Sequence, residues 1–106
     1  MLNVANKFEP AILEAINDFE KEFEESVTWG QSFDFFPDVE RATEDNVPLL
    51  ATVGIYLEIP GPAEDTVVSG SIFVPPQIEV EQIHKAVFDS LVALRQQRST
   101  APRTEH

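Results

Sequence analysis

The sequence predicts an α+β fold in which two amphipathic helices pack on a three-stranded antiparallel sheet, in the order α-β-β-β-α. Three observations predict it: residues 49–74 have the pattern of a β-hairpin, residues 27–36 alternate as a third strand, and apolar residues recur at helical spacing near both ends of the chain. A chain of 106 residues suits one domain. We expect this domain over residues 1–98, followed by a flexible tail over residues 99–106.

The first amphipathic segment predicts a helix over about residues 9–26, with Pro10 at the first helical position. Phe8 and Val27 extend an apolar stripe formed by Ile12, Ala15, Ile16, Phe19 and Phe23. Carboxylates near a helix C-terminus oppose the helix dipole and cost about 0.3–1 kcal/mol each, so we expect these side chains to be kept for a partner with a basic surface. The candidate partner-binding residues are Glu14, Asp18, Glu20, Glu22, Glu24 and Glu25.

The strand expected over residues 27–36 is rich in aromatic side chains, and we assign Trp29, Phe33 and Phe35 to the core. Pro37 ends it. Residues 37–48 are polar and bounded by prolines, which predicts a surface loop with one helical turn. The carboxylates of this loop lack the spacing of a calcium-binding EF-hand, so no metal site is expected.

The hairpin over residues 49–74 has one apolar face and one mixed face. In its first strand the core-facing residues are Leu49, Ala51, Val53, Ile55, Leu57 and Ile59, and in its second they are Val68, Gly70, Ile72 and Val74. If both helices cover that face, the opposite face remains bare and apolar. The candidate self-association residues on this opposite face are Leu50, Tyr56, Val67 and Phe73.

The last amphipathic segment predicts a helix from about Glu79 to Arg98. It holds His84, the only histidine outside the expected tail, with Glu81 three residues before it on the same helical face. A second catalytic group would have to come from the strands, where Asp34, Tyr56 and Glu58 are the candidates. Because the chain has no phosphate-binding glycine loop, zinc motif or serine elbow, we expect neither an enzyme nor a cofactor.

The charge is strongly acidic and unevenly spread. The net charge is −12, and the whole excess lies in the first 65 residues, which hold 15 acidic and 3 basic residues. Such a field repels nucleic acid and anionic membranes and favours basic partners, although it also serves solubility. There are no cysteines, no signal-peptide pattern and no long apolar run. We therefore expect a soluble protein of the cytoplasm, or of a virion if a phage encodes it.

Three functions follow as hypotheses from these features. The first is a non-enzymatic protein-interaction or assembly protein that forms a homo-oligomer. Short α+β chains that end in a basic helical turn are common among small proteins of bacterial viruses, so a phage accessory or virion-assembly component is one form of it. The second is an acidic mimic of nucleic acid that inhibits a nucleic-acid-binding or defence protein. The third is a small ligand-binding module or enzyme.

Overall fold

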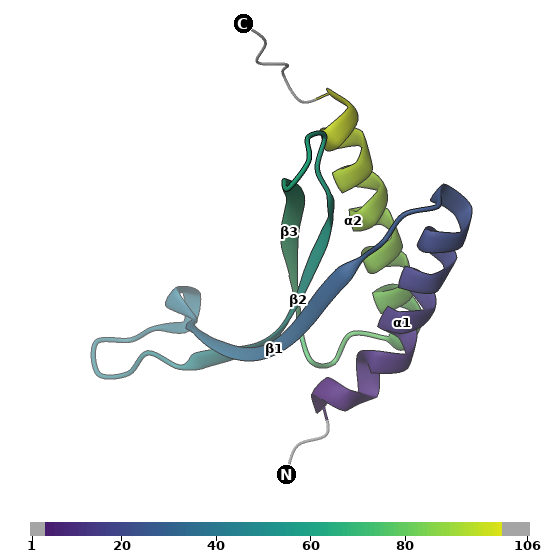
Figure 1. Ribbon diagram of the computed structural model, residues 1–106. Helices are drawn as coiled ribbons and strands as arrows, with labels where there is room; N and C mark the ends of the chain where they lie inside the picture. Colours follow the sequence, from purple (N-terminus) through teal and green to yellow (C-terminus); the bar gives the residue numbers. More distant parts are fainter. Residues whose placement is uncertain (1–3, 101–106) are drawn as a thin grey trace, which may run out of the picture.

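The computed structural model of the protein describes residues 4–100 and has the predicted order α-β-β-β-α, an α+β fold (Figure 1). A three-stranded antiparallel sheet in the order β1-β2-β3 forms one layer, and two helices form the other. The elements are α1 (Val4–Phe23), β1 (Thr28–Pro37), the short 3-10 helix η1 (Val39–Arg41), β2 (Leu49–Pro60), β3 (Val67–Val74) and α2 (Val80–Thr100).

Helix α1 begins at Val4, ahead of the predicted start at residue 9, so Pro10 lies inside the helix and not at its first position. The turn before the proline is anchored by Phe8, whose side chain is fully buried. Burying a phenylalanine stabilises a fold by about 1.5–3 kcal/mol, whereas an interior proline costs about 3 kcal/mol. The stabilisation from burying Phe8 is similar in size to the cost of the interior proline. Packing of Phe8 in the core therefore allows the helix to begin before Pro10.

The C-terminus of α1 has a helix-ending motif that stops it at Phe23, before the predicted end at residue 26. Glu24 adopts a left-handed conformation with φ of 55°, and the N–H of Glu25 donates to the carbonyl of Glu20 at 3.3 Å. This is the bond pattern of a Schellman motif, with glutamate where glycine is usual. The Glu20 carboxylate then accepts the N–H of Val27 at 2.9 Å and directs the chain into β1.

The sheet has one face toward the helices and one face away from them. In the register, Trp29 pairs with Leu57 and Phe33 pairs with Val53, and both pairs point to the helices. The core contains most of the apolar stripes of both helices and the predicted face of β2 from Val53 onward, which confirms the assignment of faces there. The prediction that Leu49 faces the core is wrong, because this residue is 64% exposed near the start of β2. The buried hydrophobic residues are Phe8, Ala11, Ile12, Ala15, Ile16, Phe19, Val53, Ile55, Leu57, Ile59, Val74, Ile83, Val87, Leu91 and Leu94.

The two helices lie side by side and run in the same direction (Figure 1). An aromatic cluster joins them: the ring of Phe88 lies 6.2 Å from that of Phe19 and 6.5 Å from that of Phe23. Because the helices are parallel, their C-terminal ends meet at one end of the molecule. There the negative poles of both helix dipoles are close together.

A two-stranded arm extends beyond the body of the sheet. β3 pairs with β2 only from Val53 onward, whereas β1 and β2 stay paired as far as Pro37 and Leu49. Residues 34–37 and 49–52, which we call the arm, bend away from the helices and contribute to a longest dimension of 55 Å (Figure 1). The prediction that Phe35 is a core residue is therefore wrong, because it lies in this arm and is 56% exposed.

Helix α2 continues to Thr100, two residues beyond its predicted end. Ser99 is part of the helix, and its hydroxyl donates to the carbonyl of Arg95 at 3.1 Å. Residues 99 and 100 therefore belong to the helix and not to the expected tail, and residues 101–106 of that tail lie outside the described part of the chain. Within residues 4–100, neither helix is long and apolar enough to cross a membrane.

Candidate functional site

The sheet face that points away from the helices, which we call the open face, carries the four predicted self-association residues. Leu50, Val67 and Phe73 are 51%, 55% and 56% exposed, and Tyr56 is 38% exposed. All four belong to the parity that faces away from the core in the register of the sheet. The structure thus brings them onto one surface, as predicted, although their role in self-association stays a prediction.

A hollow lies in the middle of the open face, where small residues stand between larger ones. It has a volume of about 340 Å³, and its floor includes Gly30, Gly54 and Ser71, with Tyr56 and Phe73 at its sides. The Phe73 ring leans over Gly54, because a Cβ built at Gly54 would lie 3.1 Å from that ring. At Gly30, in contrast, an added Cβ would meet no atom within 4 Å. The hollow is therefore open above Gly30.

The arm carries four exposed apolar side chains, of which Leu50 was predicted on the open face, Phe35 and Leu49 were predicted in the core, and Phe36 was not assigned. Phe36 and Leu50 pair across β1 and β2 and point to the open face, and the Phe36 ring packs edge-on against Phe73 at 5.9 Å. Phe35 and Leu49 are exposed on the opposite side of the arm. The signal that could have identified them is the break of alternation at Phe36, together with a β2 segment longer than β3.

The polar groups of the open face are acidic or neutral. The hydroxyl of Tyr56 donates to Glu58, which raises the pKa of Tyr56, and Ser32 donates to Asp34 at 2.7 Å. None of the residues in the three strands is lysine or arginine. Proteins that stack nucleic-acid bases on a sheet place basic groups beside the aromatic ones, and the three strands do not supply such groups.

The six predicted acidic residues do not form one exposed surface. Glu14, Asp18 and Glu22 follow one another at intervals of four along α1 and are exposed. Glu24 lies beyond the helix end and is also exposed. Glu20 and Glu25 are less exposed, because the Glu20 carboxylate accepts the N–H of Val27 and the Glu25 carboxylate pairs with Arg98. Binding of a basic partner by the remaining carboxylates stays a prediction.

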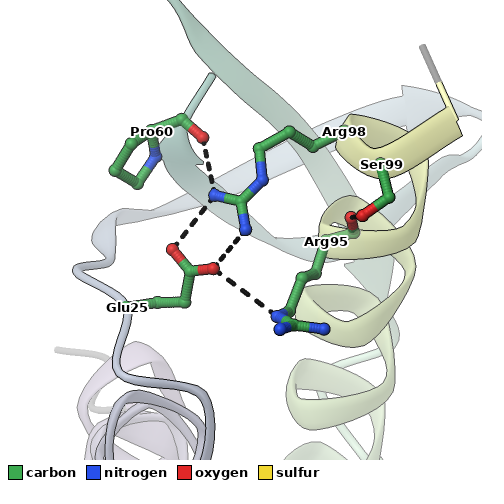
Figure 2. Close-up of polar contacts among 5 residues, drawn as sticks. All are labelled: Glu25, Pro60, Arg95, Arg98 and Ser99. Atoms are coloured by element: carbon green, nitrogen blue, oxygen red, sulfur yellow. Dashed lines mark hydrogen bonds and ion pairs between the residues drawn. The ribbon is translucent and has the colours of Figure 1, made fainter. Parts of the chain in front are cut away.

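Glu25 lies in a cluster of ionic contacts that we call the clamp (Figure 2). Its carboxylate accepts two hydrogen bonds from Arg98, one of them at 3.1 Å, and forms an ion pair with Nε of Arg95 at 3.5 Å. Arg98 also donates to the carbonyl of Pro60 at 3.0 Å, and the Arg95 guanidinium lies 4.5 Å above the Phe23 ring. The clamp joins the segment that follows α1, the last turn of α2 and the end of β2.

The clamp changes the titration of Glu25, whose side chain is only 10% exposed. The hydrogen bond from Arg98 and the charges of both arginines hold the pKa of Glu25 below its ordinary value, against the effect of burial, which raises it. The same hydrogen bond raises the pKa of Arg98. This carboxylate is therefore held as an anion by contacts within the fold, and its part in binding a partner stays a prediction.

His84 pairs with Asp18 of α1 and not, as the spacing suggested, with Glu81. Its Nε2 lies 3.0 Å from Oδ2 of Asp18, in a shallow depression that Lys21, Glu22 and Phe88 also line. None of these side chains is a hydroxyl or a thiol. The predicted strand candidates Asp34, Tyr56 and Glu58 lie on the open face, on the other side of the sheet from the helices. The structure does not bring them together with His84.

Within residues 4–100 no metal-ligand cluster indicates a function, and no known relative of the chain does so either. Among residues 4–100, no group of three or more histidine, aspartate or glutamate side chains is placed to hold a metal ion. No protein-family model, curated protein or solved structure matches the chain. The features that bear on function are therefore the open face, the arm and the exposed carboxylates Glu14, Asp18 and Glu22, which we call the acidic stripe of α1.

Proposed function

We propose that this protein is a small non-enzymatic assembly protein that forms a homo-oligomer through its open face. The observation that supports the proposal is the number of exposed apolar side chains on the open face, where Phe73 packs against Phe36 of the arm. The exposed residues are Leu50, Tyr56, Val67 and Phe73, with Phe36 beside Phe73. Monomeric proteins rarely expose apolar patches beyond a few hundred Å² unless the patch binds something. Covering this one removes apolar surface from water, at about 25 cal/mol per Å².

A second candidate function is recognition of a partner with a basic surface. The regular spacing of Glu14, Asp18 and Glu22 along the exposed side of α1 favours it. A nucleic-acid mimic would be one such protein, because it presents carboxylates where phosphates would lie. Binding of this kind should be fast and should weaken as salt is added, since mobile ions screen exposed charges.

The assembly proposal is tested by measuring the mass of the protein in solution by size-exclusion chromatography with light scattering, over a range of concentrations. The double variant Tyr56→Ser and Phe73→Ser should associate more weakly than the parent while keeping its helical and strand signals by circular dichroism. The matched control is Val39→Ser, which replaces an exposed apolar residue in η1, outside the open face. A parent protein that stays monomeric at high micromolar concentration contradicts the proposal.

A further inference from the structure

The open face includes a projecting part, the arm, and a recessed part, the hollow. These two shapes define a specific way in which two copies could associate. Phe36 and Leu50 stand on the arm, while Gly30 and Gly54 lie in the hollow beside Tyr56. The arm bends away from the helices and so toward the open side of the sheet (Figure 1). One face thus holds both a projection and a recess.

We propose that the arm of one copy docks into the hollow of a second copy around a two-fold axis, an inference that rests on the proposed self-association. A two-fold interface requires that residue i contacts residue j of the partner and that j contacts i. A projection beside a recess meets this requirement, because each arm fills the other copy's hollow. Leu50 is the inserted residue, and the open space above Gly30 receives it.

The position of the axis follows from the strand geometry. Leu50 and Tyr56 are six residues apart on β2 and therefore about 20 Å apart, and Tyr56 is the cross-strand partner of Gly30. If Leu50 of each copy lies over Gly30 of the other, the two-fold axis lies halfway between Leu50 and Tyr56 along β2. The axis then passes close to Val53, beside Gly54 and Phe73. Phe73 of each copy then lies near the centre of the interface, where aromatic residues contribute most to binding.

The area available agrees with what a stable dimer needs. Aromatic side chains bury about 150–250 Å² each, so the exposed parts of Phe36, Tyr56 and Phe73, together with Leu50 and Val67, amount to on the order of 400 Å² per copy. A standard interface buries about 800 Å² per partner, of which about 57% is apolar. A standard interface therefore buries about 450 Å² of apolar surface per partner, which is close to the exposed apolar area of the open face and the arm. We therefore assign a second copy of this chain as the occupant of the hollow.

Gly30 supplies a variant that blocks the hollow without disturbing the fold. Its φ is not positive and no atom lies within 4 Å of an added Cβ, so Gly30→Val fits the isolated chain. Valine also suits a strand better than glycine does. The control is Thr28→Val, which exchanges a hydroxyl for a methyl group on the same strand and face but outside the hollow. We expect Gly30→Val to raise the dimer dissociation constant by about tenfold or more, and Thr28→Val to leave it unchanged.

A disulfide test examines the same contact directly, because the chain has no cysteine. The double variant Gly30→Cys and Leu50→Cys should form a covalent dimer on mild oxidation. A bridge within one copy is excluded, since the two positions are about 20 Å apart and a disulfide needs Cα atoms within about 7 Å. Neither single variant should form a covalent dimer. In the proposed dimer the two copies of residue 30 are about 20 Å apart, and so are the two copies of residue 50.

The outcomes separate the two proposals. A dimeric parent that Gly30→Val converts to monomer, together with the covalent dimer of the double variant, supports arm-in-hollow docking. A dimeric parent with neither effect overturns the docking geometry and leaves self-association standing. A monomeric parent overturns both. If Gly30→Val loses its fold by circular dichroism, the disulfide test decides alone, and absence of the covalent dimer overturns the docking.

Discussion

Replacing Glu25 by glutamine should test whether the clamp, and not solubility, is the role of this carboxylate. Glutamine has the same shape, but it lacks the charge and can accept only one of the two hydrogen bonds from Arg98. Hydrogen bonds to charged groups contribute about 1.5–3 kcal/mol, whereas an exposed ion pair contributes about 0–1 kcal/mol. Because Glu25 is only 10% exposed, we expect a loss of about 2 kcal/mol in the free energy of unfolding.

Urea unfolding followed by circular dichroism measures this loss. With a slope of about 1–3 kcal/mol per M of urea, the midpoint should fall by about 1 M. The matched control is Glu24→Gln, which removes the neighbouring charge from an exposed side chain. Its midpoint should stay close to that of the parent. A double-mutant cycle with Arg98→Gln should give a coupling energy of at least about 1 kcal/mol, since the residues contact each other directly.

The pH dependence gives a second measurement, and its sign follows from the pKa of Glu25. This pKa is lower in the folded than in the unfolded protein, so the folded state holds the proton less tightly. The stabilisation is therefore complete above the unfolded pKa, about 4.3 for glutamate, and disappears as pH falls through the folded value. Parent and Glu25→Gln should differ at pH 7 and converge in acid. Equal midpoints at pH 7, or a difference that does not change with pH, would refute the reasoning.

Three further predictions concern the core, the helix end and the charge. Phe19→Ala and Ile55→Ala each remove a fully buried side chain and should lower the free energy of unfolding by about 2–5 kcal/mol; urea midpoints equal to the parent's would contradict this. Glu24→Gly should raise it by about 0.5–1 kcal/mol, because glycine favours the left-handed conformation, and a lower midpoint would count against the Schellman motif. Added salt should strengthen association of copies that each carry −12 but weaken binding of a basic partner, as measured by light scattering and by titration calorimetry.

The sequence was sufficient to predict the element order and the two faces of the sheet. Alternation at a period of two assigned Val53, Ile55 and Leu57 to one face, and all three are buried. The same parity placed Tyr56 and Phe73 on the open face. The face on which a side chain lies depends only on local backbone geometry, and the period of the apolar residues along the sequence follows from that geometry.

The arm and the clamp could not be predicted, because both depend on where segments end relative to one another in space. Phe35 fits the core parity of β1, but the arm bends away from the helices, so the helical layer does not cover this side chain (Figure 1). Glu25 and Arg98 are far apart in the chain, and only the parallel packing of α1 and α2 makes them neighbours. Likewise, His84 has a carboxylate on its own helix at the right spacing, yet its partner is Asp18 of α1.

The clamp also explains why α1 tolerates carboxylates at its C-terminus, and it limits where a partner could bind. Parallel helices bring two negative dipole ends together, and Arg95 and Arg98 lie where they can compensate both ends and Glu25. The regularly spaced carboxylates that stay exposed on α1, Glu14, Asp18 and Glu22, lie in the helical layer, on the opposite side of the sheet from the open face. A second copy on the open face would therefore leave the acidic stripe of α1 accessible. Self-association and binding of a basic partner are thus compatible in one molecule.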